Sequence, residues 1–442
     1  MELRPRLLRR LTLFDLTLIT VGSVIGSGIF RTPAVVAQRA HVPAIVVGCW
    51  LAGGIVALIG AFVFAELGAR RPLDGGLYGY LRDAYHPLAA FLFGWTLLLI
   101  SGTGANAAAA VLFAGYLEPL TGLRFDTRVV AAVTLAALAA INVLGVRQGS
   151  NWQNFVGLLK VAALITLVAA CLSVHPLASV ESPPFAFSGY GGLIGAIAVA
   201  MLPVLFSYSG FQTASFVTAE TTRAAHTIPR ALLIGIAVVI TLYVLVNVGF
   251  LRMLGMTGLA GTTAPAADAM RAATGALGAR FVALAIALST LGYLSTCMLA
   301  FPRVYYQMAA DGLFFKHVAW ISPKTNVPVV AILLQACIAS GIALSGTYEQ
   351  IVNWVVAPQW LFIFFAAGAI FILRRRDAGL PRPTVTVPLH PFSTGFFIAV
   401  LLAIFAAEVW IYPRDTLWGA AVEIAGVVTY YAWRAGQRSR NP

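Results

Sequence analysis

Long apolar segments separated by short polar stretches extend along almost the whole chain. Hydrophobic residues continue for about 18 to 28 positions at a time, and they do not alternate with polar residues as the strands of a membrane barrel do. The pattern therefore predicts an all-α integral membrane protein with about twelve transmembrane helices, and a short interfacial helix over 78–84. The expected spans are residues 13–39, 42–68, 86–117, 128–146, 152–174, 192–219, 229–253, 279–307, 327–345, 349–373, 394–412 and 416–433.

The composition agrees with a membrane location. Of the 442 residues, 60% are hydrophobic and 10% are charged, whereas a soluble protein carries about 25% charged residues. The net charge of +13 does not indicate a nucleic-acid partner, because most of the 29 Lys and Arg residues fall in loops on one side of the predicted spans. By the positive-inside rule, that side and both termini are cytoplasmic. We therefore expect a multi-pass protein of the cell (inner) membrane whose basic loops face the lipid bilayer.

The first predicted span contains an interruption. Residues 22–28 include three glycines and two serines, and each glycine inside a helix costs about 1 kcal/mol relative to alanine. In hydrocarbon, backbone groups released by a break must be satisfied by protein, water or ligand. We interpret the stretch as a break whose free amides and carbonyls bind a ligand. The plainer alternative is that the glycines only allow helices to pack closely.

A second interruption, with Pro203 and the Ser/Gly run 207–210, lies in the sixth span. Two broken spans five positions apart run in opposite directions through the membrane, which is typical of inverted repeats with a binding site at mid-membrane. The predicted organisation is a cytoplasmic N-terminus (1–12), a first repeat (13–174), a second repeat (192–373), two further helices (394–433) and a cytoplasmic C-terminus (434–442).

Ordered motifs accompany the two breaks over roughly residues 12–330. They are Gly22-x-x-x-Gly26-Ser27-Gly28-Ile29-Phe30, Glu66-Leu67-Gly68, Gly75-Gly76, Asn142-x-x-Gly145-Val146, Lys160, Phe206-x-Tyr208-x-Gly210, Glu220, Ile228-Pro229-Arg230 and Met308-Ala309-x-Asp311-Gly312. With these motifs the chain resembles the amino acid–polyamine–organocation transporter superfamily, and within it the L-type amino acid transporters and related bacterial permeases. The resemblance implies five plus five inverted helices with helices 1 and 6 broken, two further C-terminal helices, and secondary transport by alternating access.

The chain departs from this family in two respects. Phe211 stands where the family often has tryptophan, which leaves the side-chain specificity open. The cysteine that links some eukaryotic members to a heavy chain is absent, so we expect no obligate disulfide-linked heavy chain. The expected partners are an amino acid and the bilayer, and the oligomeric state is left open.

An amino acid zwitterion needs donors for its carboxylate and acceptors for its ammonium group. A helix that begins near Gly28 offers free amides and the positive end of its dipole, so we expect the amides of Gly26, Ser27 and Gly28 and the Ser27 hydroxyl to bind the carboxylate. The expected ammonium ligands are the carbonyls of Val24, Ile25, Phe206, Ser207 and Ser209. Tyr208, Phe211 and Asn106 are candidates for the side-chain pocket, with ordinary packing as the alternative.

Lys160 is the sharpest single candidate, because an ionisable residue within a span is a functional hypothesis by default. Its alternative is to extend toward the cytoplasmic interface. The resemblance implies that its ammonium group takes the place of a sodium ion and bridges the first break to the eighth helix, where Ser289, Thr290 or Ser295 is an acceptor. That role implies sodium independence. Because a buried lysine can titrate, proton coupling remains open.

Four charged residues lie at the expected cytoplasmic ends of spans: Glu66, Glu220, Arg303 and Asp311. We interpret them as an inner gate or a topology network, with solvated end charges as the alternative.

The remaining chemistry-bearing residues do not suggest an enzyme. The six His and four Cys residues show no metal-ligand spacing, and we expect no catalytic set, metal or cofactor. Because no acidic residue lies in the middle of the first, third, sixth or eighth span, a neutral substrate is favoured. The sequence therefore predicts sodium-independent exchange of small neutral amino acids. The alternatives are a proton-coupled symporter of the same fold and a non-transporting amino acid sensor.

Overall fold

The computed structural model describes residues 7–72, 75–175, 189–345, 348–411 and 413–438. The outermost residues of both expected cytoplasmic termini, 1–6 and 439–442, lie outside these ranges. Every regular element in the described residues is helical, and one isolated bridge pairs Leu11 with Thr221. Seven of the described helices are long and apolar enough to cross a membrane, and a bent pair makes an eighth. The expectation of an all-α membrane protein is confirmed.

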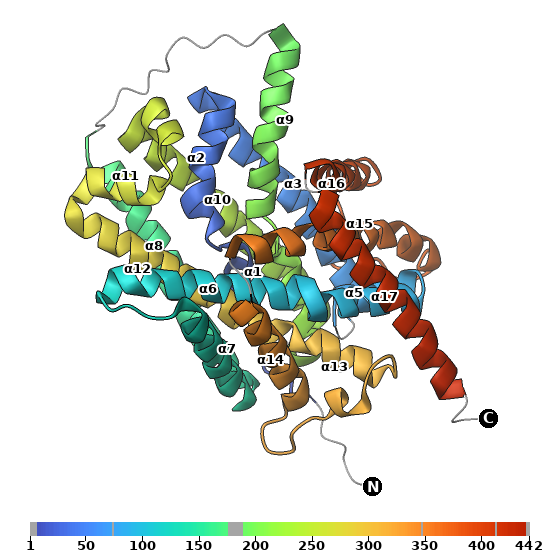
Figure 1. Ribbon diagram of the computed structural model, residues 1–442. Coiled ribbons are helices and arrows are strands. Elements are labelled where there is room, and N and C mark those ends of the chain that lie inside the picture. Colours follow the sequence, from blue (N-terminus) through green and yellow to red (C-terminus); the bar gives the residue numbers. More distant parts are fainter. Residues whose placement is uncertain (1–6, 73–74, 176–188, 346–347, 412, 439–442) are drawn as a thin grey trace.

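The helices follow one another along the chain, and their connections differ in length (Figure 1). The first part contains α1 (Leu13–Val24), α2 (Gly28–Ala40), α3 (Pro43–Arg70), α4 (Leu77–Ala84), α5 (Pro87–Thr96), the π-helical turn η1 (Leu97–Ser101), α6 (Gly102–Thr121), α7 (Thr127–Val143) and α8 (Val146–Ser173). The second part contains α9 (Gly189–Ser207), the 3₁₀ segment η2 (Phe211–Glu220), α10 (Ala224–Gly261), α11 (Pro265–Thr274), α12 (Ala276–Ala300), α13 (Pro302–Ala310), η3 (Lys316–Ala319), α14 (Val329–Ser345), α15 (Tyr348–Arg376), α16 (Phe392–Ile411) and α17 (Pro413–Arg438).

Most elements lie where the apolar pattern predicts a span. The short apolar helices α7 and α14 fall on the expected spans 128–146 and 327–345, and α4 confirms the short helix expected at 78–84. The pattern did not predict α11, because this ten-residue helix is too short and too polar to resemble a span. It also missed the π-helical turn η1 inside the third span.

The first predicted break separates α1 from α2, which are bent by 44° relative to each other. A capping box starts α1: the amide of Asp15 donates to the Thr12 hydroxyl, and the amide of Thr12 donates to the Asp15 carboxylate. At Ile25 the backbone becomes extended (φ −74°, ψ 97°). Helical structure resumes at Gly28.

The second predicted break separates α9 from η2. Gly210 adopts a left-handed conformation there, with φ of 103°. A Cβ atom at this position would lie 2.5 Å from the carbonyl oxygen of Ser23. Glycine is therefore required twice, by the backbone conformation and by the close approach of the two breaks.

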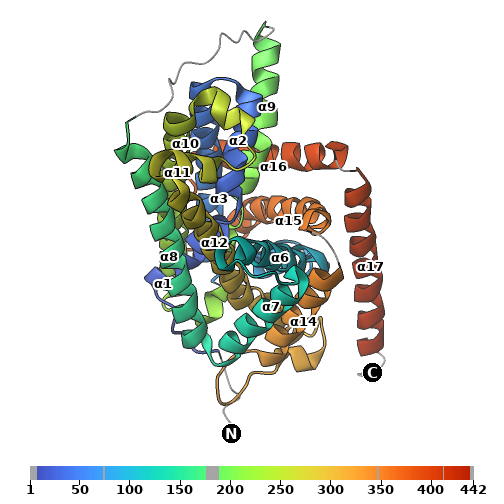
Figure 2. The same cartoon turned by 60° about the vertical axis from the view of Figure 1, so that its left-hand side comes forward.

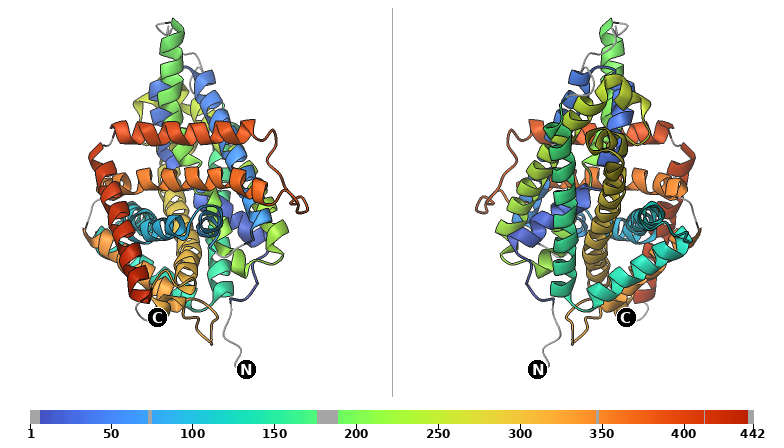
Figure 3. Two further views of the ribbon diagram at one scale, coloured as in Figure 1. Left: turned by 90° about the vertical axis from the view of Figure 1, so that its right-hand side faces the viewer. Right: turned by 90° about the vertical axis from the view of Figure 1, so that its left-hand side faces the viewer.

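The broken spans lie inside the bundle. α1 packs against α8 and α10, α2 packs against α9, and α6 packs along α12. α15 and α16 run side by side across one face of the molecule (Figure 3). α17 follows the edge of the bundle, where it contacts α5 and α15 (Figure 2). The two breaks are thus enclosed by other helices, whereas α16 and α17 lie at the periphery.

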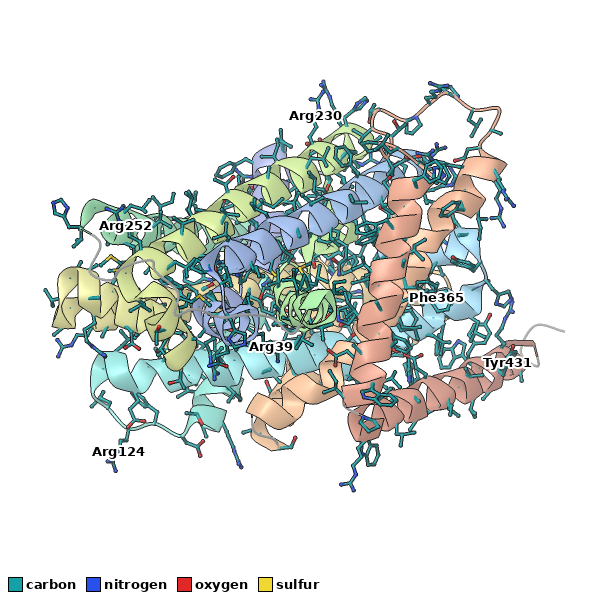
Figure 4. The ribbon with its side chains drawn as sticks, turned by 90° about the horizontal axis from the view of Figure 1, so that it is seen from above. Arg39, Arg124, Arg230, Arg252, Phe365 and Tyr431 are labelled. Carbon is teal, nitrogen blue, oxygen red and sulfur yellow. The ribbon has the colours of Figure 1, made fainter. Side chains whose placement is uncertain are left out.

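Two arginines mark the ends of α10: Arg230 lies near its start and Arg252 near its end. Figure 4 shows Arg230 at the top of the view and Arg252 at the left, with Arg124 at the lower left and Tyr431 at the right. The charge pattern assigns Arg230 to the cytoplasmic side and Arg124 and Arg252 to the outer side, and this assignment stays a prediction.

Candidate functional site

A cavity of about 140 Å³ lies between the two broken spans. From the predicted set, it is lined by Val24, Gly26, Ser27, Gly28, Phe206, Ser207 and Ser209. Residues that complete the wall are Ser23, Gly210, Thr290, Tyr293 and Gln359, with Ala105, Ala108, Ala109 and Leu112 on α6. Among the described residues, no Asp, Glu, Lys or Arg lines this cavity. The cavity is thus polar on its backbone side and uncharged throughout its described wall.

The amino-terminal end of α2 opens onto the cavity. Ser27 occupies the N-cap position, and its side chain makes no capping hydrogen bond. In the described part of the chain, no acceptor is hydrogen-bonded to the amides of Gly26, Ser27 or Gly28. Three amide donors and a hydroxyl group therefore face the cavity from the positive end of a helix, which is a suitable environment for an anionic group.

Lys160 reaches the first break from α8. Its Nζ atom donates to the carbonyl oxygens of Gly22 at 2.8 Å and Ile25 at 2.6 Å, and the residue is only 1% exposed. The eighth span contributes Ser289, whose hydroxyl donates to the Gly26 carbonyl at 3.1 Å. The ammonium group thus lies against the break rather than at the cytoplasmic interface.

The structure adds Tyr243, which the sequence did not single out. This fully buried residue of α10 holds its hydroxyl 3.2 Å from the carbonyl oxygen of Val24 and 3.1 Å from that of Ser207. One hydroxyl proton is therefore shared between carbonyls of both breaks. Nothing in the local sequence distinguishes this tyrosine, because its role depends on where α10 passes the two interruptions.

The hydrogen bonds divide the expected ammonium ligands into two groups. A carbonyl oxygen has two lone pairs, and both are used at Ile25, by Lys160 and by the Ser289 hydroxyl at 3.4 Å. Both are also used at Phe206, which accepts from the amide and hydroxyl of Ser209.

The other three expected carbonyls keep acceptor capacity. Those of Val24 and Ser207 each accept a single hydrogen bond, from Tyr243. The Ser209 carbonyl accepts none from the described residues. The structure thus narrows the acceptors that are available to a cation to Val24, Ser207 and Ser209.

A comparison with known proteins identifies the family of this chain. The sequence model described as amino acid permease matches residues 11–427. The chain belongs to the amino acid permease family. It is a membrane transporter of this family and not an enzyme.

Individual relatives cover nearly the whole permease. The serine/threonine exchanger SteT of Bacillus subtilis is 28% identical over 433 residues, which cover 97% of each chain. The cystine/glutamate transporter of Homo sapiens is 27% identical over 433 residues, 97% of this chain and 86% of the relative. The b(0,+)-type amino acid transporter 1 of Homo sapiens is 28% identical over 429 residues, 93% of this chain and 85% of the relative.

The three side-chain candidates of the permease do not line the main cavity. Tyr208 donates from its hydroxyl to the Trp50 carbonyl at 3.0 Å. Together with Phe211 it borders a separate apolar cavity of about 20 Å³ between α3, α9, α15 and α16. Asn106 is fully buried and directs its amide nitrogen to the sulfur of Met298 at 3.8 Å. On α6, small alanines face the main cavity instead.

Two of the four predicted network residues form a buried ion pair. The guanidinium nitrogens Nε and Nη2 of Arg303 each donate to an oxygen of the Glu220 carboxylate at 2.8 Å. The side chain of Arg303 is 1% exposed and that of Glu220 is 0% exposed. The amides of Arg10 and Leu11 bond the Glu220 carbonyl at 2.8 Å. The end of the sixth span is thus bound both to α13 and to the segment before α1.

The other two belong to a continuous series of ion pairs. Glu66 pairs with Arg374 and Arg70, and Arg70 continues to Asp377. Asp377 pairs with Arg71, Arg71 approaches Asp83, and Arg82 connects Asp83 to Asp311. The series thus connects the ends of α3, α15, α4 and α13, and within the described residues it has no contact with the Glu220–Arg303 pair. The described residues hold no group of three His, Cys, Asp or Glu side chains arranged as metal ligands.

Proposed function

We propose that this permease exchanges small neutral amino acids across the cell membrane without sodium. The observation that carries the proposal is the uncharged cavity between the two breaks, which offers free amides on one side and free carbonyl capacity on the other. A zwitterion needs both kinds of partner and no compensating charge. Acidic or dibasic substrates would leave a charge without a partner in the described wall, which is costly in a low-dielectric site.

The amino acid backbone would lie between the two breaks. Its carboxylate accepts from the amides of Gly26, Ser27 and Gly28 and from the Ser27 hydroxyl. Its ammonium group donates to the carbonyls of Val24, Ser207 and Ser209, since those of Ile25 and Phe206 are already fully bonded. In this arrangement the backbone of the protein recognises the backbone of the substrate.

The size of the cavity favours a small side chain. A cavity of about 150 Å³ in another protein accommodates benzene, a ligand of six heavy atoms, and the cavity here measures about 140 Å³. Alanine has six heavy atoms and serine has seven. Thr290, Tyr293 and Gln359 supply polar groups to the wall, and a related protein is a serine/threonine exchanger. These observations support serine, threonine and alanine as substrates.

The position of Lys160 supports the proposed sodium independence. Its ammonium group donates to two carbonyls of the first break, the kind of ligands that would coordinate a sodium ion there. We further propose that residues 13–174 and 192–373 act as inverted repeats around the cavity. Alternation of access would then break and remake the Glu220–Arg303 pair, which holds the sixth span closed on α13, as well as the ion pairs of Glu66 and Asp311.

The cellular setting belongs to the same proposal. The excess of Lys and Arg on one side supports an inner-membrane protein with both termini cytoplasmic. We propose that it works without a disulfide-linked heavy chain. Three of its four cysteines are buried, and the exposed one, Cys337, lies within the apolar helix α14 rather than in an outer loop.

One observation favours proton coupling as a second candidate. In the described residues Lys160 bonds only to carbonyl oxygens, and it forms no ion pair. Loss of its proton would leave no unpaired anion, so the neutral form is accessible. A proton-coupled symporter would take up substrate in response to a pH gradient in the absence of internal amino acid.

Transport into proteoliposomes separates these candidates. The purified protein is reconstituted, and uptake of radiolabelled serine is measured with and without internal serine, in sodium and in choline buffers, with and without a pH gradient. We expect uptake only with internal amino acid, at equal rates in both buffers. Competition by alanine and threonine, but not by glutamate or arginine, would support a neutral site. A requirement for sodium, or full uptake into empty vesicles, would contradict the proposal.

A further inference from the structure

A carboxyl group lies between α17 and α5, away from the substrate cavity. Glu423 is on α17, ten residues or about 15 Å beyond the start of this helix and about 16 Å before Arg434. It is only partly exposed. An ionisable side chain in a packed helix interface is costly to bury, so its partner indicates its function.

The partner of Glu423 is the hydroxyl of Thr96, which donates to the carboxyl oxygen Oε1. Thr96 is the last residue of α5 and is 1% exposed. One turn along, α17 comes so close to α5 that a Cβ on Gly426 would lie 2.8 Å from Leu92. The indole nitrogen of Trp95 also donates to the Val422 carbonyl at 3.2 Å. The carboxyl group is thus held in a tightly packed interface.

Glu423 has no cationic partner among the described residues. One hydrogen bond from a neutral hydroxyl does not compensate a carboxylate in an apolar helix interface, whereas it suits the carbonyl oxygen of a protonated carboxyl group.

Other titratable groups on the neighbouring helices lie elsewhere. Glu408 lies on α16, three residues before the end of that helix. His86 precedes α5, and its ring lies 6.3 Å from that of Tyr430, which is seven residues beyond Glu423. The remaining groups are Arg374, Arg375 and Arg376 at the end of α15, and Arg414, Tyr431 and Arg434 on α17 itself. In the described structure none of them is hydrogen-bonded to Glu423.

The third span has an irregular segment next to the contact between Thr96 and Glu423. Directly after Thr96 it forms the π-helical turn η1, which is a rare element and occurs often at functional sites. Three backbone carbonyls of this region accept hydrogen bonds from side-chain hydroxyl groups. The Ser101 hydroxyl donates to the carbonyl of Thr96, the Tyr305 hydroxyl to the carbonyl of Leu97, and the Thr103 hydroxyl to the carbonyl of Leu98. The same span continues as α6 to Ala105 in the wall of the substrate cavity. The Thr96–Glu423 contact therefore lies at the irregular part of a helix that reaches the cavity.

We propose that Glu423 is a proton-binding site, and that its protonated carboxyl group holds α17 against the third span through Thr96. Loss of the proton leaves a carboxylate that the apolar interface does not solvate, so the side chain turns toward its exposed side and α17 separates from α5. This site is distinct from the amino acid site and does not depend on the proposed function.

Two measurements on the purified full-length protein test the site without reference to transport. The infrared carbonyl band of protonated carboxyl groups is recorded as a function of pH for wild type, Glu423→Gln and Glu408→Gln. We expect wild type to retain this band well above about pH 4.3, where an exposed glutamate ionises. Part of this band should be lost in Glu423→Gln, and Glu408→Gln is the matched control that retains that part. An unchanged band in Glu423→Gln would overturn the proposal.

The second measurement is the midpoint of thermal unfolding in detergent across the same pH range. It should fall in wild type once Glu423 loses its proton, because the contact with Thr96 is then lost. Glu423→Gln, whose amide remains neutral, should not show this fall. Thr96→Val should have a lower midpoint than wild type at low pH, where wild type keeps the contact, and should therefore show a smaller dependence on pH. Equal pH dependence of wild type and Glu423→Gln would contradict the role in packing, even if the protein transports no amino acid.

Discussion

The two breaks look alike in sequence but are held in different ways. In the first span, a side chain from another helix bonds the exposed carbonyls: Lys160 of α8 reaches those of Gly22 and Ile25. In the sixth span, Ser209 donates its hydroxyl locally to the carbonyl of Phe206, three residues earlier, and Tyr243 of α10 bonds the carbonyl of Ser207. The first break therefore depends on the relative positions of several helices, whereas the sixth combines a local bond with one from α10.

This difference suggests separate tasks for the two breaks. A break whose carbonyls are bonded by α8, α10 and α12 changes shape when those helices move. A break with a carbonyl bonded by its own residues, as Ser209 bonds Phe206, depends less on such movements. We infer that the first break senses the conformation of the transporter, while the sixth presents a constant surface to the substrate.

Replacing the lysine should have the largest effect. In Lys160→Met the volume is nearly kept, but the carbonyls of Gly22 and Ile25 lose their donor, and each unsatisfied buried group costs about 1–3 kcal/mol. We expect serine exchange in proteoliposomes to fall by about 100-fold or more, because about 2.7 kcal/mol corresponds to that factor. Exchange within twofold of wild type would show that the first break does not depend on α8.

The glycine of the sixth break should come next. In Gly210→Ala the new Cβ atom must occupy a left-handed conformation with φ of 103° and lies 2.5 Å from the Ser23 carbonyl oxygen. Strain of this kind costs about 1–3 kcal/mol, so we expect exchange to fall by about 10- to 100-fold. Gly195→Ala is the matched control, since a Cβ atom there meets nothing within 4 Å. Equal activity of the two variants would show that the breaks need not approach each other so closely.

Removing the shared hydroxyl should have a smaller effect. Tyr243→Phe retains the ring but loses the donor that joins the carbonyls of Val24 and Ser207. A single hydrogen bond contributes about 0.5–1.5 kcal/mol, so we expect the apparent affinity for serine to change by about tenfold or less. Tyr431→Phe, on the exposed side of α17, is the control. If the affinity for serine did not change, the Tyr243 hydroxyl would make no contribution to substrate binding.

The sequence was sufficient to locate the two breaks, because glycine, proline and serine within apolar segments are local signals. It also located seven residues of the cavity wall: Val24, Gly26, Ser27, Gly28, Phe206, Ser207 and Ser209. Tyr243 and Gln359 could not be found in this way. Each is an ordinary residue of a continuous helix, and its position beside a break depends on the packing of helices that are distant in sequence.

The candidates for the side-chain pocket also show what the sequence alone cannot predict, namely the direction in which a side chain points. Asn106 and Ala105 are neighbours on α6, but a helix turns by 100° per residue, so one faces Met298 and the other faces the cavity. The apolar pattern of this span does not distinguish its faces, since almost every position between 102 and 115 is small or apolar. The direction of a side chain within a membrane bundle is therefore set by neighbours that the local pattern does not contain.

The smallest predicted effect is also the most direct test of the comparison. Ser289 and Ser209 each donate one hydroxyl to carbonyls of a break, but Ser289 reaches across from α12 to Gly26, whereas Ser209 bonds Phe206 within its own break. We expect Ser289→Ala to lower serine exchange by about tenfold, the effect of about 1.4 kcal/mol. Ser209→Ala should lower it by about twofold, because the Ser209 amide still bonds the Phe206 carbonyl at 3.1 Å. If both variants lost the same activity, the two breaks would be held equally by their surroundings, and the first would have no special dependence on neighbouring helices.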